Sequence, residues 1–500
     1  MPADRETRAW ALAMAGVATL AAATLSGCVV GPNYRGPPLV APKAVSAPAF
    51  HRAEDASAGP PPAKWWLALG DAELDTLIDD AFVASPDVEV AVARLRQSRA
   101  VVSKDRANLL PTTGAAAATL QTHGLTNVIG GGLSGGAAAA AQSQAASTSG
   151  NDGNFDIYSL ALDASWQLDL FGGRRRALEG DKARSQAVLA NLEDAEVSLA
   201  AEVAQDYVTL RGLQQRLALA QQNIDLESRM LTLTQVRRQG GDATDLDVER
   251  MVNQLRSTQA ETAPLRGQVA DQLDRLAILT GKAPGDLDAE LSATGPVPAP
   301  PKVVVVGDPA SLLRRRPDVR AAERTIQQKN ALIGQRTADF FPKVTLLGEV
   351  GYNATDISSL FTHNAFNYVG APMLQWSPFD FGRIRAGIRE ARGEEAEALG
   401  DYRKTVLGAL ADAETALATY GRQRENLSAL VEVESSADRA ARLTGLKVEG
   451  GTATSLDQIA AERDRVSAEN NVAYGTAQLT LDYIRLEKSL GLGWAEPTQR

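Results

Sequence analysis

Few side chains in this sequence could do chemistry on their own. The 500 residues contain one cysteine, Cys28, and three histidines that lie far apart, His51, His123 and His363. A structural zinc site needs clustered Cys and His ligands, and a disulfide scaffold needs paired cysteines. The sequence also has no Walker loop, no His-Glu-x-x-His and no Gly-x-Ser-x-Gly. We therefore expect no enzyme activity, no metal site and no bound cofactor.

The surroundings of Cys28 indicate a covalent lipid. Two arginines precede an apolar run from Trp10 to Leu25, and Leu25-Ser26-Gly27 stands directly before the cysteine. A short apolar segment that ends in small residues is typical of a secretory signal. The pattern resembles the bacterial lipobox, in which the chain is cut before the cysteine and the thiol accepts acyl chains such as palmitate. We expect a signal peptide at 1–27 and lipid on Cys28; the alternative is an uncleaved membrane anchor.

Composition and hydropathy narrow the class of protein further. Lys and Arg number 51 against 61 Asp and Glu, so the net charge is −10. An acidic chain without a long basic run is a poor nucleic-acid binder. Aromatic residues make up only 5% of the chain, and abundant alanine suits long, closely packed helices. Past residue 30 no apolar run reaches the roughly 18 residues of a membrane helix, so any membrane span must be made of strands.

The body of the chain is an internal duplication. Three features of the first half return in the second, at an offset of 231 residues for the first and 210 for the other two: Pro86-Asp87-Val88 as Pro317-Asp318-Val319, Trp166 as Trp376, and Gly240–Asp247 as Gly450–Asp457. The offset changes between Pro111 and Trp166. The stretch Gly130–Gly150, rich in Gly, Ala and Ser, accounts for the change and predicts a flexible loop inserted in the first half.

Each half has the same plan of helix, two strands, very long helix, tight turn and long helix. Apolar residues between Leu399 and Tyr420 recur on heptad-type steps of three and four. The proline-free stretch Arg174–Gln239 predicts a helix of roughly 100 Å. The glycine pairs Gly240-Gly241 and Gly450-Gly451 then predict two hairpin tips. A coiled-coil scaffold without a pore has the same helical period and stays open.

We expect the following order along the chain: a signal peptide at 1–27; a lipidated, extended N-terminal segment at 28–70; a first repeat at 71–281, with strands at about 112–126 and 155–169 and a hairpin tip at 240–244; a linker at 282–308; a second repeat at 309–491, with strands at about 343–353 and 366–376 and a hairpin tip at 450–454; and a C-terminal tail at 492–500.

The strands decide between a channel and a scaffold. Alternate positions of about ten residues are apolar, with Tyr or Trp near the ends, as in 158–166, 344–352 and 366–376. This alternation is typical of lipid-facing barrel strands, although half-buried strands of a soluble sheet show it too. Four strands cannot close a barrel, and an open edge in lipid leaves backbone groups unpaired. A chain that inserts must therefore oligomerise.

The sequence resembles the TolC-like outer-membrane factors, in the lipoprotein (NodT/OprM-type) branch that serves RND drug-efflux systems. The resemblance rests on Leu25-Ser26-Gly27-Cys28, Val30-Gly31-Pro32-Asn33-Tyr34, Trp65-Trp66, the paired Pro-Asp helix starts and both Gly-Gly tips. It implies a mainly α protein with a membrane β part: a homotrimer in which four strands per chain form a 12-stranded β-barrel, with a long α-helical barrel beyond it.

The same resemblance implies a function. It implies a passive exit duct for drugs or other small toxic molecules, set in outer-membrane lipid and extending into the periplasm. The implied partners are an inner-membrane RND-type pump and a periplasmic adaptor, or membrane-fusion protein. A type I secretion duct and a lipid-anchored periplasmic scaffold without a pore remain the alternatives.

The resemblance also implies a gate made of Asp247 and Asp457. In the family, an Asp near each tip rings the closed periplasmic end; Ala453 and Ala460 stand where an acidic or bulky group is often found nearby. Six carboxylates near an axis would favour cations, and mutual repulsion would raise some of their pKa values. The alternative is that both carboxylates only compensate the charge of a helix N-terminus, since both fall in a first helical turn.

Overall fold

The computed structural model describes residues 29–53, 56–122 and 155–494. Cys28, the predicted signal peptide and the Gly130–Gly150 stretch lie outside the described residues. The chain forms two compact units. Unit 1 comprises Met1–Gly36, Gln97–Ser185 and Arg324–Leu399, and unit 2 comprises Pro37–Arg96, Gln186–Glu323 and Gly400–Arg500. The longest helices contribute residues to both units.

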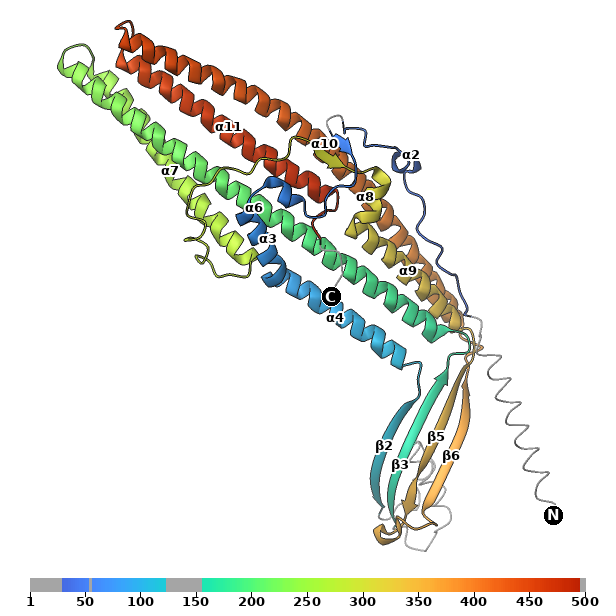
Figure 1. The fold of residues 1–500 in the computed structure, drawn as a ribbon. Helices are drawn as coiled ribbons and strands as arrows, with labels where there is room; N and C mark the ends of the chain where they lie inside the picture. The colour runs from blue at the N-terminus through green and yellow to red at the C-terminus, as the bar shows by residue number, and fades with distance from the viewer. Residues whose placement is uncertain (1–28, 54–55, 123–154, 495–500) are drawn as a thin grey trace, which may run out of the picture. The chain divides into compact units, whose positions relative to one another are not determined.

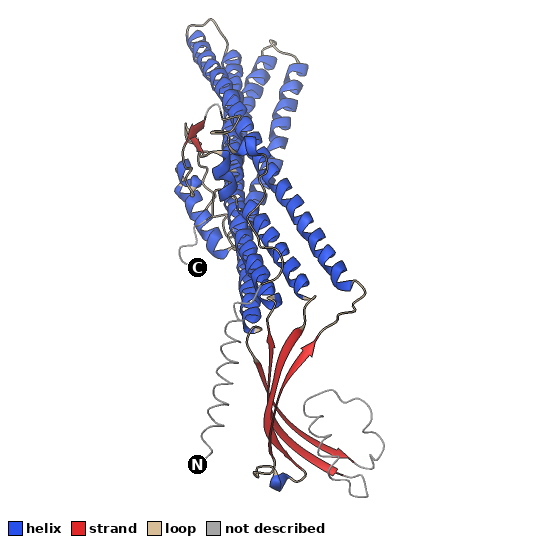
Figure 2. Cartoon of the chain, turned by 90° about the vertical axis from the view of Figure 1, so that its right-hand side faces the viewer, coloured by secondary structure: helices blue, strands red, loops and turns tan. Residues whose placement is uncertain are grey.

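Unit 1 contains an antiparallel sheet of four strands, one pair from each repeat (Figures 1 and 2). In spatial order these are β2 (Thr112–Thr122), β3 (Phe155–Leu168), β5 (Lys343–Ala354) and β6 (Phe366–Gln375). A 3-10 turn, η2 (Ile357–Ser359), lies between β5 and β6. The four strands per chain expected from the alternating pattern are therefore present. The strand predicted at 112–126 is described only as far as Thr122.

The register of the sheet brings the predicted apolar positions onto one face. Leu162 lies opposite Val350, and Val350 lies opposite Tyr368. Because alternate residues of a strand point to opposite faces, neighbouring apolar positions on all three strands share that face. Leu162 is 60% exposed and Tyr368 is 79% exposed. The sheet of one chain thus presents an apolar face that this chain does not cover.

Helical segments complete unit 1. They belong to α4 (Pro86–Ala107), α6 (Gly173–Gln239), α9 (Pro317–Ala338) and α10 (Arg383–Glu449). A Cβ added at Gly180 of α6 would lie 3.6 Å from the Cβ of Ala331 in α9, so small residues let these helices pack closely. Among the described residues, no helix is both long enough and apolar enough to cross a membrane.

Unit 2 holds the two helical hairpins. The long helices α6 and α10 each have 67 residues, and the returning helices α7 (Asp245–Leu279) and α11 (Ser455–Ser489) each have 35. These equal lengths are the duplication seen as structure. The shorter elements are α2 (Pro42–Val45), β1 (Ala56–Ala58), η1 (Trp65–Leu69), α3 (Ala72–Ala84), β4 (Val304–Val306) and α8 (Pro309–Arg315).

The core of unit 2 forms around the Trp65-Trp66 pair. Both rings are almost fully buried, and they meet edge to face with centroids 5.7 Å apart. Trp65 also meets Tyr483 of α11 at 6.1 Å. Large aromatic rings contribute much of the apolar area that a core buries. The motif therefore has a structural role, because it joins the N-terminal segment to the second hairpin.

The segment predicted as a linker packs into unit 2. Leu287 and Leu291 are fully buried, and the Gln214 side chain donates a hydrogen bond to the Leu291 carbonyl at 2.7 Å. Further along, β4 pairs in parallel with β1. Residues 282–308 therefore contribute core side chains and a strand, which their Pro- and Gly-rich composition did not indicate.

Candidate functional site: the hairpin tips, the open sheet and the helix junction

The first hairpin tip closes α6 with a Schellman motif. The Asp242 N–H donates to the Arg237 carbonyl at 2.8 Å, and the Gly241 N–H donates to the Arg238 carbonyl at 3.0 Å. This pair of bonds needs a left-handed residue just past the helix, and Gly241 has φ of 88°. Gly240 has no such φ, so only one glycine of the predicted pair is required by the turn.

The second tip repeats the first. The Thr452 N–H donates to the Lys447 carbonyl at 2.8 Å, and the Gly451 N–H donates to the Val448 carbonyl at 3.0 Å. Gly451 has φ of 72°, whereas Gly450 again lacks a positive φ. The two tips are therefore the same turn, made twice from different flanking residues.

Asp247 and Asp457 both lie in capping boxes. The Thr244 N–H donates to the Asp247 carboxylate at 3.0 Å, and the Thr454 N–H donates to the Asp457 carboxylate at 2.8 Å. Each threonine hydroxyl oxygen in turn accepts a hydrogen bond from the N–H of its aspartate. The Thr-x-x-Asp spacing is a sequence signature of this cap. Both carboxylates therefore cap a helix N-terminus, and their gate role stays a prediction.

The caps set the electrostatics of the tips in a single chain. The pKa of Asp247 and that of Asp457 are both lowered, mainly by the hydrogen bonds with their cap threonines. Arg237 of the first tip contributes to both shifts. The direction is opposite to the one expected for a closed ring of carboxylates. Arg237, which the sequence pattern did not single out, thus acts on both tips.

The Val30-Gly31-Pro32-Asn33-Tyr34 motif is held by a buried arginine of α6. The Arg176 guanidinium donates to the Val30 carbonyl at 3.2 Å, the Gly31 carbonyl at 3.4 Å and the Asn33 side-chain oxygen at 2.6 Å. Gly31 has φ of 92°, and a Cβ there would lie 2.4 Å from the Cα of Gly334. The motif is therefore a docking segment of unit 1, and its glycine cannot carry a side chain.

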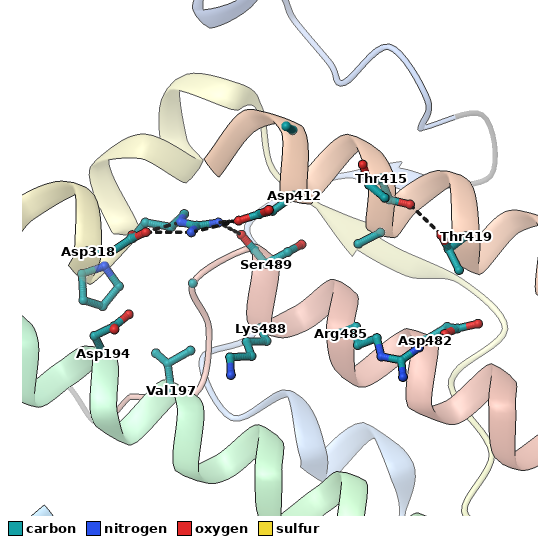
Figure 3. A pocket seen from close by; sticks show the side chains of 15 residues that line it. Asp194, Val197, Asp318, Asp412, Thr415, Thr419, Asp482, Arg485, Lys488 and Ser489 are labelled. Atoms are coloured by element: carbon teal, nitrogen blue, oxygen red, sulfur yellow. Dashed lines mark hydrogen bonds and ion pairs between the residues drawn. The ribbon is translucent and has the colours of Figure 1, made fainter. Parts of the chain in front are cut away.

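Arg316 contacts three helices of the second repeat, and its partners Asp318, Asp412 and Ser489 are labelled in Figure 3. It stands between α8 and α9, and its side chain is 13% exposed. The guanidinium donates to the carbonyl of Ser489, the last residue of α11, at 3.0 Å. It also pairs with Asp318 in the first turn of α9 at 2.7 Å and with Asp412 of α10 at 3.4 Å. One side chain thus ties the carbonyl end of α11 to the start of α9.

A cavity of about 450 Å³ lies beside this junction. Asp194 of α6 and Lys488 of α11 line it, together with the Asp482–Arg485 ion pair of α11 at 2.8 Å (Figure 3). Burial raises the pKa of Asp194, and the neighbouring charge of Asp318 adds to the effect. The cavity has charges of both signs, and no motif in the sequence predicted it.

A second buried charge lies in the same part of unit 2. Glu487 of α11 is almost fully buried, and burial raises its pKa to about 8, against lowering contributions from Tyr483 and Arg315. Its Oε2 atom has no hydrogen-bond partner among the described residues. Burying a carboxylate whose oxygens are not all hydrogen-bonded is costly, so the neutral acid is the form that this environment favours.

The sheet of unit 1 ends in two open edges. Strands β2 and β6 each pair on one side only. Every residue of β6 except Asn367 is exposed. The face opposite the apolar one carries Asp163 directly across from Glu349. Among the described residues, no group of three or more His, Cys, Asp or Glu is placed to hold a metal ion.

These features together define a class of protein. The chain has two equal helical hairpins, a duplicated tip, and a sheet with one uncovered apolar face and two unpaired edges. The fold matches solved outer-membrane channels. The OprN channel has a TM-score of 0.78 and 33% identity, over 93% of this chain and 100% of that chain. The open-state MtrE channel of Neisseria gonorrhoeae has a TM-score of 0.76 and 26% identity, over 95% of this chain and 100% of that one.

Sequence comparison gives the family. The model described as outer membrane efflux protein matches residues 77–282 and 309–492. The chain is 28% identical to nodulation protein T of Rhizobium leguminosarum bv. trifolii, over 94% of this chain and 95% of that protein. It is 29% identical to outer membrane protein OprJ of Pseudomonas aeruginosa, over 96% of each.

The chain therefore belongs to the outer membrane efflux protein family, and its fold is that of the TolC-like outer-membrane channels. It is an outer-membrane component of an efflux system. The family consists of channel proteins of efflux systems, not of enzymes. The resemblance drawn from the sequence motifs is confirmed.

Proposed function

We propose that three copies of this chain form a passive exit duct through the outer membrane, as part of a tripartite efflux system. Its partners are a periplasmic adaptor and an inner-membrane RND-type pump, which supplies the energy. The cargo is a drug or another small toxic molecule. Nodulation protein T and OprJ are similar chains, and so is SrpC of Pseudomonas putida, which is described as a solvent efflux pump outer membrane protein.

The uncovered sheet carries this proposal. A sheet whose apolar face is exposed and whose two edges are unpaired is not a stable end state in water or in lipid. Joining several copies edge to edge removes every edge and leaves one continuous apolar outer face. With four strands per chain, three copies make a 12-stranded β-barrel, and the helices contribute an α-helical barrel. A coiled-coil scaffold without a pore gives no reason for this sheet.

Conductance of the purified protein in a planar lipid bilayer tests the proposal. We expect discrete channel openings from a trimer, and chemical cross-linking of the same sample should give a three-chain product. A monomer that binds lipid and never conducts would support the scaffold. Neighbouring genes separate the two kinds of duct: an adaptor with an RND-type pump indicates drug efflux, and an ABC exporter indicates type I secretion.

We further propose that Asp247 and Asp457 form the closed periplasmic end of the duct. Their carboxylates lie at the two tips, and Arg237 acts on both of them. A ring of such carboxylates attracts cations. The capping boxes do not oppose this role, because a cap uses one carboxylate oxygen and leaves the negative charge at the tip.

Two substitutions at one position separate the gate from the cap. Asp457→Asn keeps an oxygen for the Thr454 N–H and removes the charge, whereas Asp457→Ala removes both. We expect both variants to conduct more in the resting state and to lose block by trivalent cations, with helix loss only in Asp457→Ala. Asp242→Asn, which neutralises a tip carboxylate outside the boxes, is the control. Unchanged conductance and unchanged block in both variants would show that Asp457 is only a cap.

We also propose that the chain is cut before Cys28 and that this thiol carries palmitate or a similar acyl chain. The lipobox pattern supports the assignment, and the motif that follows is docked on unit 1 by Arg176. Cys28→Ser should abolish labelling by palmitate while the variant still reaches the membrane fraction through its strands. Palmitate bound to the variant would show that the acyl chain is attached elsewhere.

A further inference from the structure

A cavity of about 360 Å³ lies in unit 1 where the second pair of strands joins its helices. Lys343 begins β5, and Trp376 directly follows the end of β6. Arg336 lies in the last turn of α9, and Arg383 is the first residue of α10. Figure 1 shows β5 and β6 running up to these helix ends. The cavity is therefore at the boundary between sheet and helices.

Two cations of this cavity have no ion-pair partner. Three of the five charged side chains that line it are positive and two are negative. Asp339 pairs with Lys343 at 3.0 Å, and the Asp380 carboxylate accepts backbone N–H groups at the start of α10. Arg383 donates from Nε to the Asp380 carbonyl at 3.1 Å. Within the part of the chain that the structure describes, no carboxylate forms an ion pair with Arg336 or Arg383.

The stems of these two arginines approach each other across the helices. A Cβ added at Gly387 would lie 3.9 Å from the Cδ atom of Arg336. Gly387 is four residues after Arg383, and residues four apart share one face of a helix. The absence of a side chain at Gly387 thus leaves room for Arg336 beside the first turn of α10. Both side chains are exposed and can reach one ligand.

Further arginines follow along α10. Residues 383–392 contain four arginines and one glutamate. Arg385, Arg389 and Arg392 are exposed and stand at steps of four and three, so they share one face of the helix. The chain as a whole has a net charge of −10. This corner is therefore locally positive in an acidic protein.

The other side of the cavity is apolar. Trp376 is 55% exposed, and its indole N–H donates to the Phe340 carbonyl at 3.1 Å. Leu374, which is 65% exposed, lies two residues earlier and so points to the same face of the sheet. Phe379 and Phe381 are 85% and 97% exposed just before α10. Exposed aromatic rings beside cations match the boundary between acyl chains and headgroups.

We infer that this cavity binds an anionic phospholipid, with its phosphate on Arg336 and Arg383 and its acyl chains along the apolar face of β5 and β6. The inference rests on the proposed β-barrel, which would bring these strands into lipid, and it adds a ligand at the barrel's helical end. A guanidinium presents parallel N–H donors that fit a phosphate. A negative headgroup is favoured over a zwitterionic one because the lining and the neighbouring arginines are net positive.

The first repeat does not share this site. At the offsets of the duplication, the three cations are replaced by Asp105, Thr112 and Gly173. Asp105 shares a hydrogen bond with the Asp181 side chain, so the corresponding corner holds carboxyl groups instead of guanidinium groups. Each chain should therefore bind one such lipid, and a trimer should bind three.

Native mass spectrometry of the full-length protein in detergent tests the site. Phosphatidylglycerol is added in steps, and phosphatidylcholine is added to a parallel sample. We expect up to three phosphatidylglycerol molecules per trimer and weaker retention of phosphatidylcholine. Combining Arg336→Gln with Arg383→Gln should weaken phosphatidylglycerol binding at least about tenfold, the factor expected for one lost charge-assisted hydrogen bond.

Two control variants separate charge from structure. Arg336→Lys with Arg383→Lys keeps both charges and should retain most of the binding. Arg403→Gln removes an exposed arginine of α10 that does not line the cavity, and it should bind like wild type. A loss of binding in Arg403→Gln equal to that of the double glutamine variant would overturn the assignment to this cavity.

The remaining outcomes separate the ligand from its alternatives. Equal retention of the two lipids would overturn the preference for a negative headgroup. Displacement of phosphatidylglycerol by millimolar glycerol 3-phosphate would show that the site takes a soluble phosphate. A double glutamine variant that binds lipid normally but no longer forms trimers would show that the two arginines serve contact between copies.

The same samples keep this inference apart from the proposed function. A trimer that conducts in a planar bilayer but retains no phosphatidylglycerol would overturn the lipid site and leave the duct intact. A monomer that never conducts would overturn the duct. Retention of one phosphatidylglycerol by that monomer, lost in the double glutamine variant, would still support the site.

Discussion

The same turn ends the returning helix of each repeat, but what packs against it differs. Gly281 after α7 and Gly491 after α11 have nearly identical φ, 70° and 71°. A Cβ at Gly281 would lie 2.3 Å from the backbone oxygen of Ala84, whereas a Cβ at Gly491 would lie 2.8 Å from the side chain of Arg316. The nearest contact at the first junction is thus with backbone, and at the second it is with the side chain of Arg316, followed by the Arg316 Cα at 3.0 Å.

The difference extends to the neighbouring positions. Ala84, Ser85 and Ala277 of the first junction correspond to Arg315, Arg316 and Glu487 of the second. The two junctions share the same backbone turn. The first packs small residues closely, whereas the second has charged residues at the corresponding positions. The second junction should therefore respond to pH and to loss of charge, whereas the first should respond only to added volume.

The largest effect is expected for Arg316→Ala. The substitution leaves Asp318 without its counter-charge near Asp194 and removes the charge-assisted hydrogen bonds to Asp318 and to the Ser489 carbonyl, each of which contributes about 1.5–3 kcal/mol. Urea unfolding followed by circular dichroism measures the loss. Ser85→Ala, at the corresponding position of the first repeat, should cost less than about 1 kcal/mol. Similar losses for the two variants would remove the contrast between the junctions.

The glycine substitutions should show the reverse order, with a larger loss of stability for Gly281→Ala than for Gly491→Ala. Gly281→Ala adds overlap with a rigid carbonyl to the strain of a left-handed alanine, so we expect a loss of about 3 kcal/mol. Gly491→Ala would bring its Cβ to 2.8 Å from the Arg316 Cγ and 3.0 Å from the Arg316 Cα. Both contacts are looser than the 2.3 Å contact at Gly281, so we expect a smaller loss, of about 1–2 kcal/mol. Paired unfolding curves decide the order, and a larger loss at Gly491 would contradict it.

Glu487→Gln tests whether the stability of the second junction depends on pH. The folded pKa of about 8 lies above the unfolded value near 4.5, so folding takes up a proton between these values. Wild-type stability is therefore full below pH 4.5 and falls as the pH rises towards 8. Glutamine mimics the neutral acid, so the variant should be more stable than wild type at pH 8 and about equal to it at pH 4.5. Melting curves that stay parallel across this range would show that Glu487 does not titrate.

The smallest effects are expected at the tips, where the repeats agree. Gly241→Ala and Gly451→Ala should each cost about 1 kcal/mol, because the turn needs a left-handed residue there. Gly240→Ala and Gly450→Ala should be neutral or slightly stabilising, since these positions lack a positive φ. Helix content during thermal unfolding measures all four. A tip whose first glycine is the sensitive one would show that the turns differ.

Local patterns in the sequence predicted most of the fold. The duplication is visible as repeated motifs, and the strands follow from alternation along short segments. The tip turns and the caps depend on residues that are neighbours in the chain, and Thr244-x-x-Asp247 could have revealed the cap. The contacts of Arg316 could not be predicted in this way. Its partners Asp412 and Ser489 are 96 and 173 residues away. The influence of Arg237 on Asp457 likewise depends on how two hairpins lie together.

Arg176 holds the segment after Cys28 on unit 1 through hydrogen bonds with Val30, Gly31 and Asn33. The proposed lipid on Cys28 would therefore be attached two residues before a fixed backbone. The Val30 N–H donates to the Phe171 carbonyl at 3.2 Å, at the corner between β3 and α6. Because Val30 follows Cys28 by two residues, acyl chains on Cys28 would attach this corner to the membrane surface. Copies attached to the membrane in this way would diffuse in two dimensions, at a raised effective concentration, before their strands pair.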